Sequence, residues 1–527
     1  MNTLFELNVF KFVPGDTTFL PKEGWQKAPL RMIFDVKAED HRHKARFVVG
    51  GHKLDSTGYN IYSSTVKSLS IRLLLVIAAH TGLETMTADV MNAFCTAPNQ
   101  EKVWVECGAE FKDRQGQRAI IQRALYGMAS ASRSFHDFLG DALMEIGFRP
   151  SRADPDLWIL DSEDHAGYDY MATWVDDLIC VAKDPQKYMQ LVEQQFHLRN
   201  MEFKPKLYLG MDLKELPNGK KHISSQSYIN ESIRRYESEH GDIRKCNTPM
   251  IMEAHPELDD SPLLGESDHR RYQKIIGICQ WICHTGRMDI NFATSSLSRF
   301  AASPRAKHLK MAEQILGYLK KYPKKGIVIN PESPQFSNKQ YLEVEFQEDF
   351  GNQYKYFHEN LDPSFPTPKI KGLTTMFFCD ADHGHDKVTG RSVTGLIGFV
   401  GSTPVTHKSK RQQAVQTSTY GAELTALKST VEEVLELRYY LRSMGVAVDH
   451  ETPVFVDNRS VVLNVTNPAS PLNKKALALA YHFVREHQHG KVVSIRSIGT
   501  DDNYADVFTK PLGANKFHGF IKEMMGD

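Results

Sequence analysis

The sequence predicts an α/β protein of several domains. The chain has 527 residues, which is too long for one hydrophobic core, so about two to four domains are expected. Apolar segments with the period of strands alternate with segments of helical period. A stretch rich in Pro, Asn, Gln and aromatic residues, 331–372, has no clear period and is expected to be a linker or an insertion before the last α/β unit.

In the first half of the chain, residues 1–65 hold short apolar runs and a basic patch. A helix with an apolar face is expected to begin at Ser68 and to end at Gly82. A strand over 83–90 is expected to follow, with Asp89 near its end. Further expected elements are a helix over 133–146, strands over 157–161 and 168–182, a helix over 186–198, a hairpin turn at 217–219, and helices throughout 268–322.

The last 155 or so residues begin a new α/β unit. The expected strands are 374–380, 393–400 and 453–457, and the expected helices are 419–444 and 474–487.

Composition narrows the classes of protein. Lys and Arg together number 64, and Asp and Glu together also number 64, so the formal net charge is zero. A nucleic-acid coat protein, in contrast, is usually basic. Seven scattered cysteines argue against a disulfide framework and favour a reducing compartment. Cys279, Cys283 and His284 lie in an apolar stretch, which favours a buried helix face over a zinc site. No apolar run is long enough to span a membrane and no signal peptide is evident, so we expect a soluble intracellular protein.

Two adjacent carboxylates, Asp176 and Asp177, interrupt an otherwise apolar strand. Burying both is costly unless something neutralises them. An exposed turn is the simpler alternative, but the apolar residues on both sides favour metal binding. Asp89 also ends an apolar strand, and three carboxylates suit two Mg²⁺ ions.

A second acidic set occurs in the C-terminal unit, and each member alone would more often be a cap or a turn residue. Together, carboxylates at strand ends can form a site for two Mg²⁺ ions that activate a water. Lys408, Lys410 and Arg411 form either a patch that contacts nucleic acid or an exposed loop. The acidic set is Asp380, Glu423, Asp457 and Asp506.

An ordered set of motifs resembles the reverse transcriptase of copia-type retrotransposons over about residues 25–325. The C-terminal acidic set and Thr509-Lys510-Pro511-Leu512 resemble the ribonuclease H domain of the same elements. The polymerase motifs are Lys44-Ala45-Arg46, Asp89-Val90-Met91-Asn92-Ala93-Phe94, Ala124-Leu125-Tyr126-Gly127, Trp174-Val175-Asp176-Asp177, Tyr208-Leu209-Gly210-Met211 and Gly286-Arg287-Met288-Asp289-Ile290.

The resemblance implies a right-hand polymerase with fingers, palm and thumb, followed by a ribonuclease H-like α/β domain. The implied boundaries are fingers and palm over 1–255, a helical thumb or connection over 256–330, the linker or insertion over 331–372, and ribonuclease H over 373–527. The implied catalytic metal ligands are Asp89, Asp176, Asp177, Asp380, Glu423, Asp457 and Asp506, and the implied substrate-binding residues are Lys44, Arg46, Phe94, Ser130 and Val175.

The resemblance also implies an activity and its partners. Phe94 would reject a ribose 2′-hydroxyl, and Lys44 and Arg46 would contact the triphosphate. Each centre would use two Mg²⁺ ions, with Mn²⁺ as the alternative. The expected partners are an RNA template, a DNA primer, RNA–DNA hybrid and dNTPs, and no membrane. A dimer or an association with other element-encoded proteins is a further expectation. The expected location is cytoplasmic, in virus-like particles, with nuclear entry as an extension.

The sequence departs from the family pattern at several positions, and these departures leave two rival hypotheses open. Ser130 stands where the family usually has a longer Gln, and Trp174 stands where it usually has Tyr; His383 and His407 each replace a Trp. One rival is a catalytically impaired, nucleic-acid-binding relic, and the other is a protein in which only ribonuclease H works. Because the family's polyprotein carries further domains upstream, we expect Met1 to begin a fragment, a processed product or a truncated copy.

Overall fold

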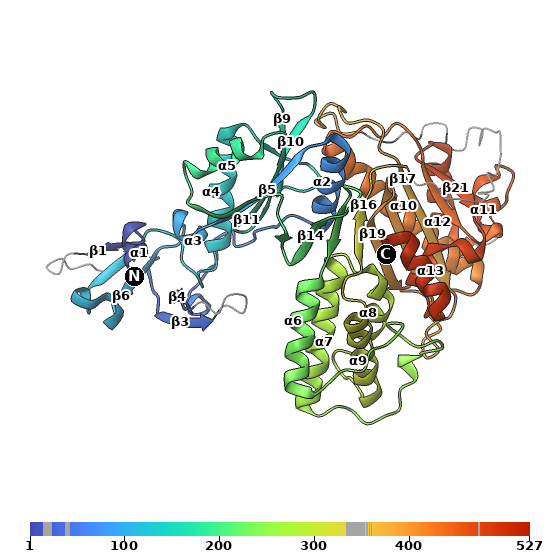
Figure 1. Ribbon diagram of the computed structural model, residues 1–527, viewed down its shortest axis with the longest axis horizontal. Helices are drawn as coiled ribbons and strands as arrows, with labels where there is room; N and C mark the ends of the chain where they lie inside the picture. The colour runs from blue at the N-terminus through green and yellow to red at the C-terminus, as the bar shows by residue number, and fades with distance from the viewer. Residues whose placement is uncertain are drawn as a thin grey trace. The chain divides into compact units, whose positions relative to one another are not determined.

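The computed structural model describes residues 1–13, 24–36, 43–333, 354, 357, 359, 361–472 and 475–526 (Figure 1). The chain divides into two structural units. The first contains Met1–Lys67 and Glu84–Lys204, and the second contains Ser68–Leu83 and Pro205–Asp527. The predicted domain boundaries at 255, 330 and 372 stay predictions.

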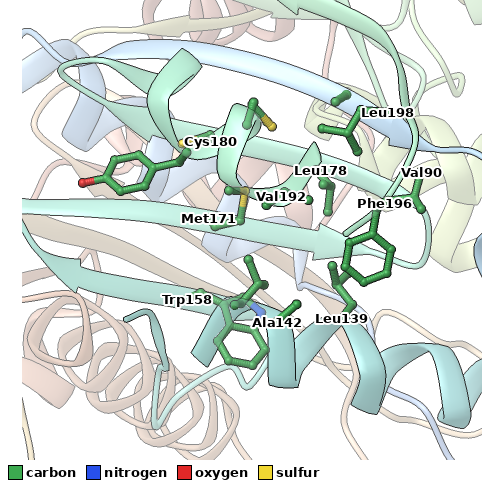
Figure 2. Packing of buried hydrophobic residues seen from close by; sticks show 14 of the residues in the cluster. Val90, Leu139, Ala142, Trp158, Met171, Leu178, Cys180, Val192, Phe196 and Leu198 are labelled. Carbon is green, nitrogen blue, oxygen red and sulfur yellow. The ribbon is translucent and has the colours of Figure 1, made fainter. Parts of the chain in front are cut away.

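A six-stranded antiparallel sheet forms the centre of the first unit, in the order β12–β5–β11–β10–β9–β8. One of its faces is covered by helices α4 (Ala131–Ile146) and α5 (Pro185–Glu193), whose apolar side chains pack on Met171, Leu178 and Cys180 (Figure 2). The strands are β5 (Glu84–Val90), β8 (Arg149–Pro150), β9 (Leu157–Asp161), β10 (Tyr168–Trp174), β11 (Asp177–Ala182) and β12 (Leu198–Phe203).

The predicted hairpin of 157–161 with 168–182 is confirmed in the pairing of β9 with β10. Its second strand, predicted to be interrupted at Asp176 and Asp177, does not continue to 182, because the chain reverses at Val175–Asp176 to form a β10–β11 hairpin. Trp174 pairs with Asp177 across this two-residue turn. Val175 adopts φ 53° there, a conformation that is rare for a β-branched residue. The predicted helix over 186–198 also ends earlier, at Glu193, since Leu198 begins the edge strand β12.

The rest of the first unit contains a small four-stranded sheet, β1–β7–β6–β2, and the separate hairpin β3–β4. Phe10, Phe47 and Phe111 meet in its core. Its elements are α1 (Asn2–Glu6), β1 (Phe10–Phe12), β2 (Gln26–Lys27), β3 (Leu30–Val36), β4 (His43–Val49), α3 (Ala93–Thr96), β6 (Val103–Glu106) and β7 (Arg118–Ile121).

Four helices and a four-stranded sheet begin the second unit. The predicted helical stretch over 268–322 is confirmed, and Cys279 and Cys283 are buried along α7 as expected. The hairpin turn predicted at 217–219 joins β14 and β15. The elements are β13 (Leu207–Tyr208), β14 (Met211–Glu215), β15 (Lys221–Ser224), α6 (Gln226–His240), α7 (Glu266–His284), α8 (Asn291–Ser298), α9 (Ala306–Lys321) and β16 (Gly326–Ile329).

A five-stranded mixed sheet, β19–β18–β17–β20–β21, completes the second unit (Figure 1). Strand β17 runs antiparallel to β18 and parallel to β20, and α10 packs on β17 and β18. The predicted loop at 408–411 is part of strand β19. The elements are β17 (Thr375–Asp382), β18 (Val393–Val400), β19 (Thr403–Arg411), α10 (Thr419–Ser443), β20 (Thr452–Val456), α11 (Arg459–Thr466), α12 (Ala478–His489), β21 (Val493–Ser497) and α13 (Ala514–Met525).

Helix α2 (Ser68–Thr81) belongs to the second unit although its neighbours in sequence belong to the first. Arg72 is buried in this helix and donates hydrogen bonds to the carbonyl oxygens of Val405 in β19 and His284 at the end of α7, both at 2.6 Å. Buried guanidinium groups need such acceptors. These contacts hold α2 to the later half of the chain.

The predicted linker over 331–372 lies largely outside the described residues. Its described part packs on the second unit. Glu359 accepts hydrogen bonds from Arg438 and Arg442 of α10 at 2.5–3.0 Å, and Ile370 forms a bridge with Val446. The two guanidinium groups hold the pKa of Glu359 at about 2, although burial alone would raise it. This part of the segment therefore contributes to the C-terminal fold.

We predict that Glu359→Gln lowers the free energy of unfolding of the second unit by about 2–3 kcal/mol near neutral pH. The pKa of folded Glu359 lies below its ordinary value of 4.5. Its contribution is therefore present above about pH 4.5 and is lost as the pH falls toward 2. Thermal unfolding at several pH values measures this effect. An equal loss at pH 3 and pH 7, or the same loss in the exposed control Glu451→Gln, contradicts it.

A second prediction concerns Arg287 and Asp289, whose buried side chains form a two-bond ion pair at 2.8 and 2.9 Å. Tyr318 of α9 donates a further hydrogen bond to Asp289 at 2.6 Å. Asp289→Ala should destabilise the second unit by about 3–5 kcal/mol, because it leaves a buried charge without its partner. In urea unfolding, the exposed pair Glu266–Arg270 provides the control, and Glu266→Ala should change nothing measurable.

Two candidate metal centres

The first acidic set lies on the sheet face opposite α4 and α5. Ala88 and Val90 in β5, and Leu178 in β11, point toward the helices. Since side chains alternate along a strand, Asp89 and Asp177 point to the other face. The register pairs them directly across β5 and β11. The sharp turn at Val175 places Asp176 beside them, and the backbone carbonyl of Asp176 accepts a hydrogen bond from Val90 at 2.8 Å.

The closeness of these three carboxylates changes the pKa of one of them. The pKa of Asp177 is raised to about 7 by burial, by its hydrogen bond with Asp89 and by the neighbouring charge of Asp176. Asp89 has two further partners on β12. Arg199 Nε lies 3.2 Å and Asn200 Nδ2 lies 2.7 Å from the same carboxylate oxygen, Oδ2. The first set therefore already contains one positive side chain.

The substrate-binding residues predicted for this set have different surroundings. Phe94 contacts Tyr126, with ring centroids 4.9 Å apart, and the Arg46 guanidinium lies 5.9 Å from the same Tyr126 ring centroid. Val175 is half-buried in the turn beside Asp176. The side chain of Lys44 lies outside the described residues, so its predicted contact with the triphosphate stays a prediction.

Ser130 is fully buried just before α4. Its backbone N–H and its hydroxyl both donate to Glu101 Oε1, at 2.8 and 2.6 Å. The structure thus gives the side chain an internal partner, which the sequence pattern did not indicate. Its role in substrate binding stays a prediction.

The second acidic set gathers at one edge of the mixed sheet. Parallel strands β17 and β20 pair Cys379 with Val456, so the residues that follow them, Asp380 and Asp457, are neighbours at the same edge. Asp380 does not end its strand as predicted, since β17 continues to Asp382. Glu423 reaches this edge from the first turns of α10. One ligand atom from each of the three carboxylates lies within 4.8 Å of the others.

Burial and mutual repulsion raise the pKa values of this set. The pKa of Glu423 is raised to about 9 and that of Asp380 to about 7, in both cases chiefly by burial. The pKa of Asp457 is raised for the same reason. Glu423 Oε2 is buried without a hydrogen-bond partner. Such a cluster is stabilised by a cation.

Asp506, the fourth predicted ligand, is fully buried beside this set and is held by two lysines. Lys510 Nζ lies 2.7 Å from Asp506 and 3.7 Å from Asp380. Lys516 Nζ lies 3.0 Å from the other oxygen of Asp506. The Thr509 hydroxyl donates to Asp380 at 2.5 Å. Asp380 and Asp506 thus share one positive partner, Lys510.

Both sets offer the oxygen ligands that hard divalent cations prefer. The second set fits a cation closely, since it combines converging carboxylates with an unpartnered buried oxygen. Within the described part of the chain, it alone brings three candidate ligand atoms within 4.8 Å of one another. In the first set Asp89 is oriented by Arg199 and Asn200, so a cation there must compete with them.

Comparison with known proteins finds similarity to reverse transcriptases. A family model described as "Reverse transcriptase (RNA-dependent DNA polymerase)" matches residues 17–252. The retrovirus-related Pol polyprotein from transposon RE1 of Arabidopsis thaliana is 27% identical over 507 residues, which cover 94% of this chain and 31% of that protein. The one from transposon TNT 1-94 of Nicotiana tabacum is 24% identical over 523 residues, covering 96% of this chain and 36% of that protein.

The chain is similar to copia-type Pol polyproteins of retrotransposons over most of its length. It spans about a third of the length of these curated relatives. The predicted resemblance is thereby confirmed.

Solved structures show weaker likenesses. A foamy viral protease–reverse transcriptase in complex with RNA/DNA hybrid covers 95% of this chain and 52% of its own, with a TM-score of 0.47 and 12% identity. LC11-RNase H1 in complex with RNA/DNA hybrid covers 26% of this chain and 94% of its own, with a TM-score of 0.21 and 15% identity. The similarity to reverse transcriptases is carried by the sequence matches.

The polar residues that contact the two acidic sets were not predicted from the sequence. Arg199 and Asn200 stand in an unremarked stretch between α5 and the next hairpin, and Lys510 was noted only as part of the domain end. Asn200 has φ 50°, and asparagine is among the residues that tolerate this conformation. Arg199 and Asn200 lie within β12, a stretch in which apolar and polar residues do not alternate regularly, so no local pattern indicated a strand there.

We predict that Asp380→Asn stabilises the protein against heat in EDTA at about pH 8, by about 1–2 kcal/mol. The pKa of folded Asp380 lies at about 7, above its ordinary 3.8. The cost of its ionisation to folding therefore grows as the pH rises from 3.8 to about 7 and is fully present at about pH 8. Mg²⁺ should raise the melting temperature of the parent chain more than that of the variant, which loses a ligand of the second set only. The exposed Asp449→Asn is the control. A variant that melts below the parent in EDTA contradicts the prediction.

Proposed function

We propose that this chain is an RNA- and DNA-directed DNA polymerase with ribonuclease H activity, from a copia-type retrotransposon. The observation that carries the proposal is the presence of two separate carboxylate clusters, each on the face or edge of a sheet, in a chain similar to these Pol polyproteins. The first lies within the family-model match at 17–252. The second lies in the C-terminal unit, which the curated Pol relatives also cover.

At the first centre, Asp89, Asp176 and Asp177 would hold two Mg²⁺ ions, with Mn²⁺ as the alternative. Bound ions would activate the primer 3′-hydroxyl and stabilise the departing pyrophosphate. The rigid hairpin turn fixes two of the carboxylates, and strand pairing with β5 fixes the third. Phe94, packed on Tyr126, would restrict the space beside the sugar, and Arg46 would contact the triphosphate.

At the second centre, Asp380, Glu423, Asp457 and Asp506 would hold two further Mg²⁺ ions. Bound ions would activate a water for in-line attack on the RNA phosphate. The burial of Asp380 and Glu423 restricts their motion, and Lys510 and Lys516 balance part of the negative charge. Lys408 and Lys410 of β19 remain candidates for contact with the hybrid, although Lys408 also pairs with Glu433 at 2.6 Å.

The proposal implies an RNA template, a DNA primer, RNA–DNA hybrid and dNTPs as partners, bound largely through phosphate contacts that weaken as salt rises. We propose a cytoplasmic location in virus-like particles, with nuclear entry, and association with itself or with other element-encoded proteins. No helix in the described ranges has the length and apolar character needed to cross a membrane.

A protein in which only the second centre works is the rival hypothesis. It is favoured by one observation, namely that the described carboxylates converge within 4.8 Å at the second set alone. Separate assays of the two activities distinguish the hypotheses.

The test is Mg²⁺-dependent extension of a DNA primer on an RNA template, beside cleavage of RNA–DNA hybrid. We predict that Asp176→Asn with Asp177→Asn reduces extension about a thousandfold and leaves cleavage intact, because only the first set loses ligands. Glu423→Gln with Asp457→Asn should do the reverse.

Asp161→Asn, at an exposed ion pair with Arg149 of the same sheet, is the matched control and should leave both activities unchanged. Cleavage without extension by the folded parent chain supports the rival hypothesis. If the folded parent chain shows neither extension nor cleavage, the hypothesis of a nucleic-acid-binding relic is the one that remains.

A further inference from the structure

Arg199 occupies a built position at the first centre. Strand β12 pairs with β5, and its register shifts between Arg199 and Glu202. Irregularities of this kind re-aim side chains beside functional sites. Here the shift, with Asn200 in a left-handed conformation at φ 50°, turns two consecutive side chains toward Asp89. Both contact one oxygen, Asp89 Oδ2.

The Arg199 contact is accessible and of moderate strength. The Arg199 side chain is 32% exposed and that of Asp89 is 23% exposed, so water reaches both. Only Nε is seen to contact Asp89, at 3.2 Å. A guanidinium presents five N–H donors and prefers to bind carboxylate or phosphate through two of them.

A second arginine, Arg46, lies near the ring of Tyr126. Arg46 in β4 lies over Tyr126, and the positive charges of Arg46 and Arg199 both act on the Tyr126 hydroxyl. The charge of Arg199 also acts on Asp177. The charges of two guanidinium groups from different strands therefore act at Tyr126, and Arg199 also contacts the acidic set. Such a pair is suited to a ligand with several phosphates.

A cation at Asp89 competes with Arg199 for the same oxygen. When two divalent cations neutralise the three carboxylates, the attraction that holds Arg199 is removed. The freed guanidinium then lies beside a site that must accept a highly negative triphosphate. Asn200 is neutral and has no comparable attraction for phosphate.

We infer that Arg199 is a triphosphate-binding residue that exchanges Asp89 for the phosphates of the incoming nucleotide when cations bind. The inference rests on the proposed polymerase function and adds a residue to its substrate-binding set. Without cations, Arg199 holds Asp89 in place and limits repulsion within the acidic set. With cations and nucleotide, it contributes positive charge to the triphosphate site, as Arg46 is proposed to do.

The test uses the full chain carrying Glu423→Gln and Asp457→Asn, so that cation binding reports mainly on the first centre. Mn²⁺ alone is titrated by electron paramagnetic resonance, and dTTP binding is then measured by equilibrium dialysis at saturating Mn²⁺. Arg199→Met should bind Mn²⁺ several-fold more tightly, because the internal competitor is gone. It should bind dTTP about tenfold more weakly, because a charge-assisted contact is lost.

Two further variants separate the two roles. Asn200→Ala should also bind Mn²⁺ more tightly, but should bind dTTP as the parent does. Arg199→Lys keeps the charge without the planar fork and should fall between parent and Arg199→Met for dTTP. Arg149→Met, which breaks the Arg149–Asp161 pair of the same sheet, is the matched control and should change neither affinity.

Equal dTTP affinities in Arg199→Met and Arg149→Met overturn the inference, as does weaker Mn²⁺ binding by Arg199→Met, which would make Arg199 a support of the acidic set. If the parent binds dTTP and extends primers while Arg199→Met behaves identically, only the role of Arg199 falls. If the parent neither binds dTTP nor extends primers, the polymerase function falls together with it. Thermal unfolding of each variant verifies that it is folded.

Discussion

Repulsion between neighbouring carboxylates is the constraint on which both centres depend. Each centre brings three or more acidic side chains onto one sheet face or edge, where burial strengthens their repulsion. The raised pKa values of Asp177, Asp380 and Glu423 are its direct expression. A fold that keeps such groups together must supply positive charge, from cations or from its own side chains.

The chain supplies that charge differently at its two centres. At the first, Arg199 reaches Asp89 from an irregular edge strand and remains partly exposed. At the second, Lys510 and Lys516 contact Asp506, which is fully buried. The first arrangement is easily exchanged for another partner, whereas the second is part of a more enclosed site. Rigid strand pairing positions the acids in both.

Much of this architecture could be predicted from residues alone, for identifiable reasons. Strands β5 and β18, helix α2 and the β14–β15 turn follow from period, caps and turn chemistry, which are local. The seven acidic residues were named because their motifs occur in family order. The β10–β11 reversal was missed because apolar residues flank Asp176 and Asp177 on both sides and hide the turn. The partners of Ser130, Asp89 and Glu359 are distant in sequence, and no local pattern indicates such pairing.

The placement of α2 has a consequence for how the chain acquires its structure. The bond between Arg72 and Val405 spans 333 positions in sequence. At about 5–20 residues per second of synthesis, the helix leaves the ribosome roughly 15–70 s before its partner strand exists. During that interval α2 lacks the part of its native cover that β19 supplies, although the end of α7 is made earlier. The cost of closing so long a loop must be met before the contact with β19 forms. Folding of the second unit is therefore tied to synthesis of β19, and α2 is a segment that a chaperone would protect while it waits.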